Sequence, residues 1–300
     1  ALGGASTSSE NKRNVAIGAS AMSGTNAGAA QNIAIGYAAL DGNLTSAADD
    51  NVAVGYYALG GITSGTRNTA IGTNAGATST DVDKTVLIGY NAGGSNMTSD
   101  ADGTIAIGEH AGYALTSGIG NVAMGFQALF AEDDGDYSTA IGHNSLNAQT
   151  GTSGTVKNTA VGYATMAATT TGTYNVAVGG NALATATTVL KSVALGTHAM
   201  SDVPASQAID GVVAIGYEAF KGAGSTTTGA DGTIAIGKSA LTALTSGQYN
   251  TAIGHNSMDE HLTGRANTCL GWGTMSQSGG DTTAQDNTFI GTSSGGGDWA

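Results

Sequence analysis

The sequence predicts an all-β fold, a β-solenoid in which sixteen short repeats stack as coils along one axis. Three observations predict it: one five-residue motif recurs sixteen times without interruption, the commonest step between copies is 17 residues, and 49 of the 300 residues are Gly. Aromatic residues make up only 5% of the chain and charged residues 10%. A conventional core of large side chains is therefore not expected, whereas stacked repeats bury small apolar residues against their neighbours.

The motif has the pattern N-[TV]-A-[IV]-G. Its copies are NVAIG (14–18), NIAIG (32–36), NVAVG (51–55), NTAIG (68–72), TVLIG (85–89), TIAIG (104–108), NVAMG (121–125), STAIG (138–142), NTAVG (158–162), NVAVG (175–179), SVALG (192–196), VVAIG (212–216), TIAIG (233–237), NTAIG (250–254), NTCLG (267–271) and NTFIG (287–291). The third position is Ala except at Leu87, Cys269 and Phe289. Alternating large and small β-forming residues over about four or five positions predict a short strand.

The two faces of each strand are predicted to differ, with Val, Thr and Ile on one face and Ala and Gly on the other. We therefore expect two packing interfaces, one inside the coil and one against a partner chain. The column of small residues, which includes Ala140, should tolerate enlargement less well than the exposed His143. The opening Asn is present in ten copies and is expected to form a stacked amide ladder.

The glycine that closes each motif is expected to be a structural turn residue, because Gly readily adopts positive φ. These glycines are Gly18, Gly36, Gly55, Gly72, Gly89, Gly108, Gly125, Gly142, Gly162, Gly179, Gly196, Gly216, Gly237, Gly254, Gly271 and Gly291. Four residues later lies a second apolar column, with Leu, Met or Phe in twelve copies and Gly in four. Each copy should comprise a strand, a corner, a second short extended segment and a turn, and no pocket is expected.

The spacing of the copies leaves two arrangements open. Longer steps fall at nearly every third copy, with polar inserts such as 98–103 and 228–232. One arrangement is a homotrimer whose loops protrude at every third coil. The other is a single chain that circles an axis and places three copies in each layer. With layers about 4.8 Å apart, the first predicts roughly 75 Å per chain and the second roughly 25 Å. We favour the homotrimer.

The motif followed by x-x-A-[LM] resembles the head repeats of YadA-like trimeric autotransporter adhesins, and it is similar to repeats of phage tail fibres. The resemblance covers essentially the whole chain. It implies a left-handed parallel β-roll that forms a homotrimer with two further copies of itself. It also implies an extracellular location on a cell surface or virion, and attachment to a host glycan or protein receptor. The repeat is longer than the usual head repeat, and we interpret residues 1–300 as a single repeat domain, a segment of a longer fibre.

Charge and composition exclude several partner classes. A net charge of −13 with only 9 Lys and Arg argues against nucleic acid, whose binding depends on basic side chains. No stretch approaches the roughly 18 consecutive apolar residues of a membrane span, so no membrane insertion by this segment is expected. The single Cys269 excludes an internal disulfide framework.

Few sequence motifs point to a catalytic or ligand-binding site, and those that do are unspecific. Gly232 to Ser239 match the phosphate-loop pattern G-x-x-x-x-G-K-[ST], but the repeat itself produces this spacing and no helix is expected after it. His143 and His255 directly follow a motif glycine, and His110 and His198 lie one place later. We expect surface histidines there, with a metal site on a trimer axis as the alternative. No Ser, His and Asp set recurs, so we predict no catalytic residues, no cofactor and no enzyme activity.

Acidic residues gather in the linkers, as at 49–50, 81–83, 100–102 and 132–136. Calcium prefers such oxygen-rich loops, but no stretch matches a known calcium-loop pattern. We therefore expect solvated loop charge, with Ca²⁺ binding as the alternative.

An aromatic row follows the motif glycines. Its members are Tyr37, Tyr56, Tyr90, Phe126, Tyr163, Tyr217 and Trp272. Rings with polar groups suit a sugar or protein receptor, so these residues are candidates for receptor contact. The alternative is that the rings simply cover the corner of the coil.

Together these observations favour a structural or adhesive fibre shaft of a tail fibre or cell-surface adhesin, used in host attachment. The alternatives are an ice- or crystal-binding solenoid and a passive filament-forming surface protein. The motif threonines, such as Thr69 and Thr139, alternate irregularly with Val and Ile, which disfavours a regular ice-binding face. A depolymerase built on a β-helix would need paired carboxylates in a cleft, whereas the acidic residues of this chain lie in the linkers.

Overall fold

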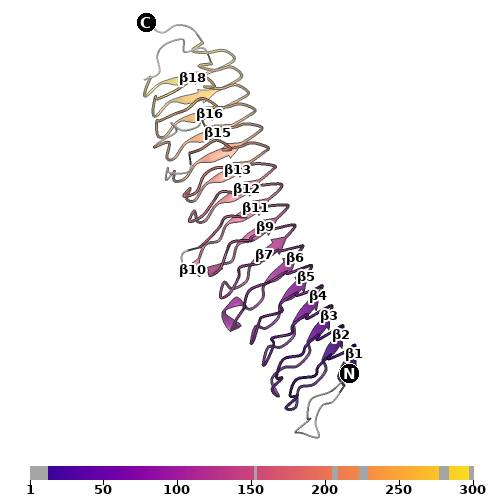
Figure 1. Cartoon of the computed structure of the whole chain (residues 1–300). Helices are drawn as coiled ribbons and strands as arrows, with labels where there is room; N and C mark the ends of the chain where they lie inside the picture. The colour runs from indigo at the N-terminus through magenta and orange to yellow at the C-terminus, as the bar shows by residue number, and fades with distance from the viewer. Residues whose placement is uncertain (1–12, 152–153, 205–208, 223–228, 277–283, 297–300) are drawn as a thin grey trace. The chain divides into compact units, whose positions relative to one another are not determined.

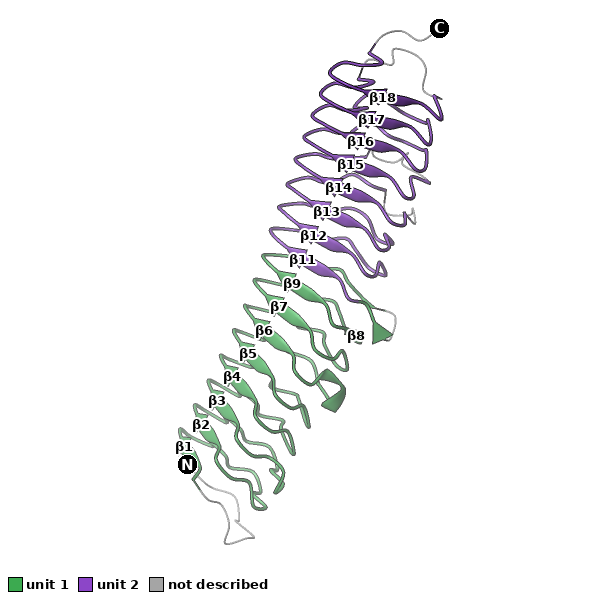
Figure 2. Ribbon diagram, turned by 180° about the vertical axis from the view of Figure 1, so that it is seen from behind, with its two compact units in different colours: residues 1–156 green, residues 157–300 purple. Residues whose placement is uncertain are grey.

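The computed structural model describes residues 13–151, 154–204, 209–222, 229–276 and 284–296. The chain divides into two compact units, residues 1–156 and 157–300, and each is a stack of parallel coils (Figure 2). Within the described ranges, the only helical element is one 3₁₀ turn, Ser99–Ala101. The predicted all-β solenoid is therefore confirmed for both units.

One three-residue strand forms in each motif copy (Figure 1). In unit 1 the strands are β1 (Val15–Ile17), β2 (Ile33–Ile35), β3 (Val52–Val54), β4 (Thr69–Ile71), β5 (Val86–Ile88), β6 (Ile105–Ile107), β7 (Val122–Met124) and β9 (Thr139–Ile141). In unit 2 they are β11 (Thr159–Val161), β12 (Val176–Val178), β13 (Val193–Leu195), β14 (Val213–Ile215), β15 (Ile234–Ile236), β16 (Thr251–Ile253), β17 (Thr268–Leu270) and β18 (Thr288–Ile290). A second, two-stranded pairing in unit 1 joins β8 (Gly135–Asp136) to β10 (Gly154–Thr155).

Within each unit, every strand pairs in parallel with the strand of the next copy in the sequence, in the order β1-β2-β3-β4-β5-β6-β7-β9 and β11 to β18. The register is the same at each step, so that Ala34 pairs with Ala53 and Ala53 with Ala70. One copy therefore makes one coil. This pairing excludes the arrangement in which one chain circles an axis with three copies in each layer.

The small central residue of each strand points into the coil. Ala34, Ala70 and Ala140 are fully buried, whereas the neighbours of Ala140 on the strand are at least partly exposed. Successive side chains of a strand point to opposite faces, so the β-branched residues must point outward. The Ala column is thus the interior column.

The second apolar column completes the interior. Leu40, Leu59 and Met200 are fully buried, but their backbones are left-handed, with φ of +52°, +49° and +55°. This column therefore lies in a run of tight turns. The predicted second extended segment is found, among the described residues, only in some coils, as the β8–β10 pair and the parallel bridges Asn26–Leu44 and Leu190–Asp210. The turns still bond between coils, since the backbone N–H of Leu59 donates to the carbonyl of Ala75 at 3.0 Å. Left-handed backbone costs about 1–2 kcal/mol per non-Gly residue, which burial of a Leu side chain offsets.

Large residues in the interior column are matched by glycines in the second column. Leu87 replaces the usual Ala, and a Cβ placed on Gly76 or Gly93 would lie 2.7 or 3.0 Å from its methyl groups. Similarly, a Cβ on Gly295 would lie 2.7 Å from the ring of Phe289. Beside Leu87 and Phe289, the glycines of the second column thus leave the space that the larger side chain occupies, whereas Gly112 faces Leu115.

The opening asparagines form the predicted amide ladder. In unit 1 the backbone N–H of Asn51 donates to Oδ1 of Asn32 at 2.9 Å, and that of Asn68 donates to Oδ1 of Asn51 at 3.0 Å. Each Nδ2 also closes its own coil, as Asn51 does by donating to the carbonyl of Gly65 at 2.8 Å. In unit 2, Asn175 donates to Oδ1 of Asn158 in the same way. These buried amides satisfy backbone groups that the short strands leave unpaired.

Candidate functional site: the outer surface of the coils

The outward residues of the strands, mostly Val, Ile and Thr, form a partly exposed face on each unit. In unit 1, Ile17, Ile71 and Ile141 are 57%, 40% and 37% exposed. In unit 2, Val178 and Leu270 are 40% and 45% exposed. Because the register is constant, these side chains stand in continuous columns along the strands of their unit. We call these columns the outer face.

The motif glycines lie where each strand turns away from the outer face. All sixteen have φ between +116° and +139°, a region that residues with a side chain rarely adopt. The coils also approach closely here: a Cβ on Gly36 would lie 2.5 Å from the carbonyl oxygen of Gly55. Both the conformation and the spacing require Gly at this corner.

The aromatic row begins one residue after this corner and therefore runs along one edge of the outer face. All seven rings are exposed, from 39% for Phe126 to 61% for Tyr163. Tyr37 and Tyr56 stack across adjacent coils, with ring centroids 5.4 Å apart and an angle of 9° between the ring planes. The rings thus present polarisable faces and edges to the outside.

The histidines extend this row. His143 stacks on Phe126 at 5.0 Å, and His255 stacks on Trp272 at 6.5 Å. His110 and His198 contact Tyr90 and Tyr217 edge-on. The histidines pair with aromatic rings, and among the described residues they are not part of any group of three metal-ligating side chains.

The phosphate-loop match lacks the architecture of a phosphate site. Its middle residues form β15, and the segment that follows is a turn in which Ser239 has a φ of +56°. Lys238 extends over the ring of Tyr217, with Nζ 6.0 Å from the centroid. No helix N-terminus follows the glycines at this described position, so the amides cannot cradle a phosphate in the usual way.

Most of the acidic linker residues bond to the backbone of an adjacent coil. Oδ1 of Asp49 accepts the N–H of Ala30 at 2.6 Å, and Oδ1 of Asp83 accepts that of Thr66 at 2.7 Å. Asp102 accepts the N–H of Asp83, also at 2.7 Å. These carboxylates therefore accept hydrogen bonds that join neighbouring coils. The prediction that they are only solvated loop charges is wrong for them. In the second polar insert Thr228 lies outside the described residues.

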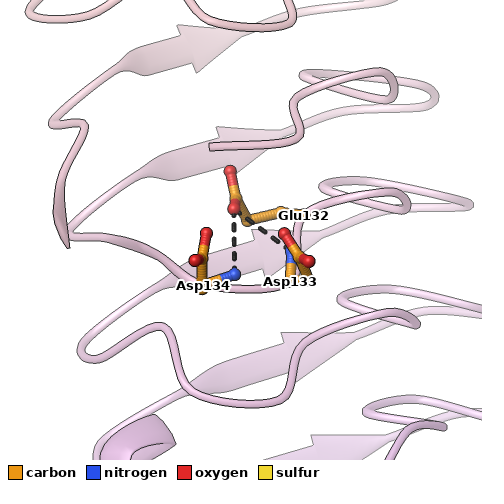
Figure 3. A group of neighbouring side chains, drawn as sticks. All are labelled: Glu132, Asp133 and Asp134. Carbon is orange, nitrogen blue, oxygen red and sulfur yellow. Dashed lines mark hydrogen bonds between the residues drawn. The ribbon is translucent and has the colours of Figure 1, made fainter. Parts of the chain in front are cut away.

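Glu132, Asp133 and Asp134 form one cluster of carboxylates in unit 1, each offering an oxygen within 4.8 Å of the others (Figure 3). Oε1 of the buried Glu132 accepts the N–H groups of Asp133, Asp134 and Gly135 at 3.1, 3.2 and 2.7 Å. Its Oε2 accepts from Gln149 Nε2 at 2.5 Å and from the N–H of Gly151 at 3.2 Å.

Five donors saturate the carboxylate of Glu132, so this residue organises a turn and has little capacity left for a cation. Burial raises the pKa of the Asp134 carboxyl above its ordinary value, and the neighbouring Asp133 and Glu132 raise it further. The donor set therefore fits a hydrogen-bonded loop better than the calcium site considered from the sequence.

A groove in unit 1 was not expected from the sequence. Tyr57 and Tyr113 come from the third and sixth coils, and Asn74 and Asn91 come from the two coils between them. The remaining lining residues are Ala77, Thr78 and Gly94, and the groove, which is open to solvent, has a volume of about 350 Å³. The prediction that no pocket arises is therefore wrong. We call this feature the Tyr57–Tyr113 groove.

The groove was not predicted from the sequence because its residues occupy different columns of different repeats. Tyr57 and the two asparagines lie two places after a motif glycine, whereas Tyr113 lies five places after one. Gly60, Ala77 and Gly94 are small residues in that latter column, which was the available signal.

Across the described ranges, no helix is both long enough and apolar enough to cross a membrane. Comparisons with protein-family models, with curated proteins and with solved structures each found no match.

Proposed function

We propose that this chain is a non-catalytic shaft segment of an extracellular fibre, a tail fibre or cell-surface adhesin, in which three identical copies wind together as left-handed β-rolls. The observation that carries this proposal is the outer face. Contiguous apolar residues that a chain leaves partly exposed are typical of interaction sites. A second and third copy of the chain would present the same columns at the same spacing, so that the faces match along their length.

Two further features support a passive, elongated role. The repeats are uninterrupted, and stability in such stacks comes from neighbouring coils rather than from a closed core with an enclosed active site. Few strand edges are also left unpaired, since each strand within a unit pairs on both sides except at the ends of the stack. The exposed aromatic row remains available at the rim of the outer face for a host receptor.

The experiment is sedimentation of the full chain, together with electron microscopy of the particles. We expect a mass of about 88 kDa, three times the 29.2 kDa of one chain, and rods roughly 75 Å long if sixteen coils stack at about 4.8 Å. A stable monomer at micromolar concentration would contradict the proposal.

A further inference from the structure

We propose that the Tyr57–Tyr113 groove binds a neutral saccharide. This proposal names a ligand class for the attachment role proposed above and rests on that role. The groove itself is formed by a single chain and does not require the trimer. All of its residues lie in unit 1, on four successive coils.

The two tyrosine rings are held in place by glycine backbone. A Cβ on Gly60 would lie 2.8 Å from the ring of Tyr57, and one on Gly94 would lie 2.6 Å from the ring of Tyr113. Each ring therefore lies directly against glycine backbone, which leaves no room for any other residue there. Tyr113 is also stacked on Phe130, with centroids 5.3 Å apart and planes within 10°. Tyr57 and Tyr113 are 37% and 36% exposed, so part of each residue is open to a ligand.

Between the rings lie amides and a hydroxyl. The side-chain amide of Asn74 makes no hydrogen bond within the part of the chain that the structure describes, so its donors and its acceptor are available. Nδ2 of Asn91 lies 3.3 Å from Nε2 of His110, which orients that amide and leaves its oxygen to accept. Thr78 donates to the carbonyl of Gly94 at 3.1 Å, which fixes its hydroxyl while the oxygen can still accept.

This combination fits a sugar better than other ligand classes. The apolar C–H face of a pyranose packs on an aromatic ring, and its hydroxyls each donate and accept, as amides do. No lining residue is charged, and the chain carries a net charge of −13, so an anionic ligand is disfavoured. The volume of about 350 Å³ lies at the lower end of small-ligand sites, which suits a short stretch of a glycan chain.

The test is binding of the full chain to immobilised neutral oligosaccharides, namely hexamers of α-1,4-glucose, β-1,4-glucose, β-1,3-glucose, mannose and N-acetylglucosamine, with a sialylated oligosaccharide as the anionic comparison. The variants are Tyr57→Ala, Tyr113→Ala and Asn74→Ala. Ala occupies the position of Tyr57 and Asn74 in other coils, at Ala38 and Ala164, with φ of +49° in both. Ala likewise occupies the position of Tyr113 in another coil, at Ala77. These variants should therefore fold, which far-UV circular dichroism and the melting temperature check.

We expect at least one neutral hexamer to bind and each variant to weaken it about tenfold. Tyr249→Ala is the matched control, because Tyr249 is a 63% exposed tyrosine in unit 2 and should leave binding unchanged. The bulky Thr78→Trp should block the groove.

Binding of none of the neutral hexamers, equal binding by Tyr57→Ala and wild type, or selective binding of the sialylated probe would overturn the proposal. The outcomes separate from those of the shaft proposal. A trimer that binds no sugar retains the shaft and loses the groove, whereas a monomer whose sugar binding depends on Tyr57 and Tyr113 retains the groove and loses the trimer.

Discussion

The interior column and the outer face are built from adjacent residues of the same strands, yet they obey different rules. Ala140 is completely buried, whereas Ile141, its neighbour in the chain, is 37% exposed. The chain covers the small residue completely and the large aliphatic one only in part. Size is therefore restricted inside by the coil, whereas outside a large apolar side chain recurs in the same register and is only partly covered by its neighbours. This contrast is the reason for proposing that copies of the chain meet at the outer face.

The largest expected effect comes from enlarging the interior column. Ala140→Phe must force apart a coil closed by backbone above and below, and we expect it to destabilise by more than about 4 kcal/mol or to prevent folding. His143→Ala, on the exposed row three residues away, should change stability by less than about 0.5 kcal/mol. Urea unfolding of both variants measures the contrast, and equal tolerance would show that the Ala column does not face inward.

A second test concerns the two interior columns, where the large Leu87 of one column lies beside the small Gly93 of the other. Leu87→Ala should cost about 2–5 kcal/mol by leaving a cavity, and Gly93→Leu about 1–3 kcal/mol by overpacking. Gly93 has a φ of +57°, close to the +49° of Leu59, so its backbone already suits Leu. The double variant restores the common pattern and should be less destabilised than Leu87→Ala alone. Simple addition of the two losses in urea unfolding would contradict volume matching.

Glu132 tests whether the acidic cluster is structural. Glu132→Gln places an NH₂ group opposite donors that now reach a carboxylate oxygen, and we expect a loss of about 1–3 kcal/mol. Asp133→Asn changes charge by the same amount at an exposed residue and should have little effect. Thermal unfolding with and without Ca²⁺ compares them. A strong stabilisation of wild type by Ca²⁺ that Glu132→Gln abolishes would instead indicate a metal site.

The smallest effect at neutral pH concerns Cys269, which occupies the interior column of β17. Burial raises the pKa of its thiol to about 12 from 9.0. The folded state then holds the proton more tightly than the unfolded state, so stability is unaffected below about pH 9 and falls as the pH rises toward 12. Cys269→Ala should match wild type at pH 7 and lose less stability between pH 9 and pH 11. Rapid labelling of the native thiol at pH 8 would contradict an interior position.

The strands, their register and the amide ladder followed from the motif, because alternation and a constant step specify which residues face each other in stacked coils. The left-handed turns did not, since nothing about Leu or Met at Leu59 or Met200 indicates positive φ. The Tyr57–Tyr113 groove did not follow either, because it arises from residues of two different columns on four coils. The Asp-to-backbone bonds depend on how loops of unequal length align between neighbouring coils. Sequence spacing alone does not determine that alignment.

The most direct test of the account is the mass of a variant whose outer face carries charge. Ile71→Lys with Ile141→Lys would bury two ammonium groups per chain between copies, at a cost of several kcal/mol per charge. We predict that this variant folds, by circular dichroism, but sediments as a monomer of about 29 kDa, while Ser46→Lys with Thr155→Lys, at exposed loop and edge positions, remains a trimer. If both variants and the wild type have the same mass, the outer face is not where copies of this chain meet.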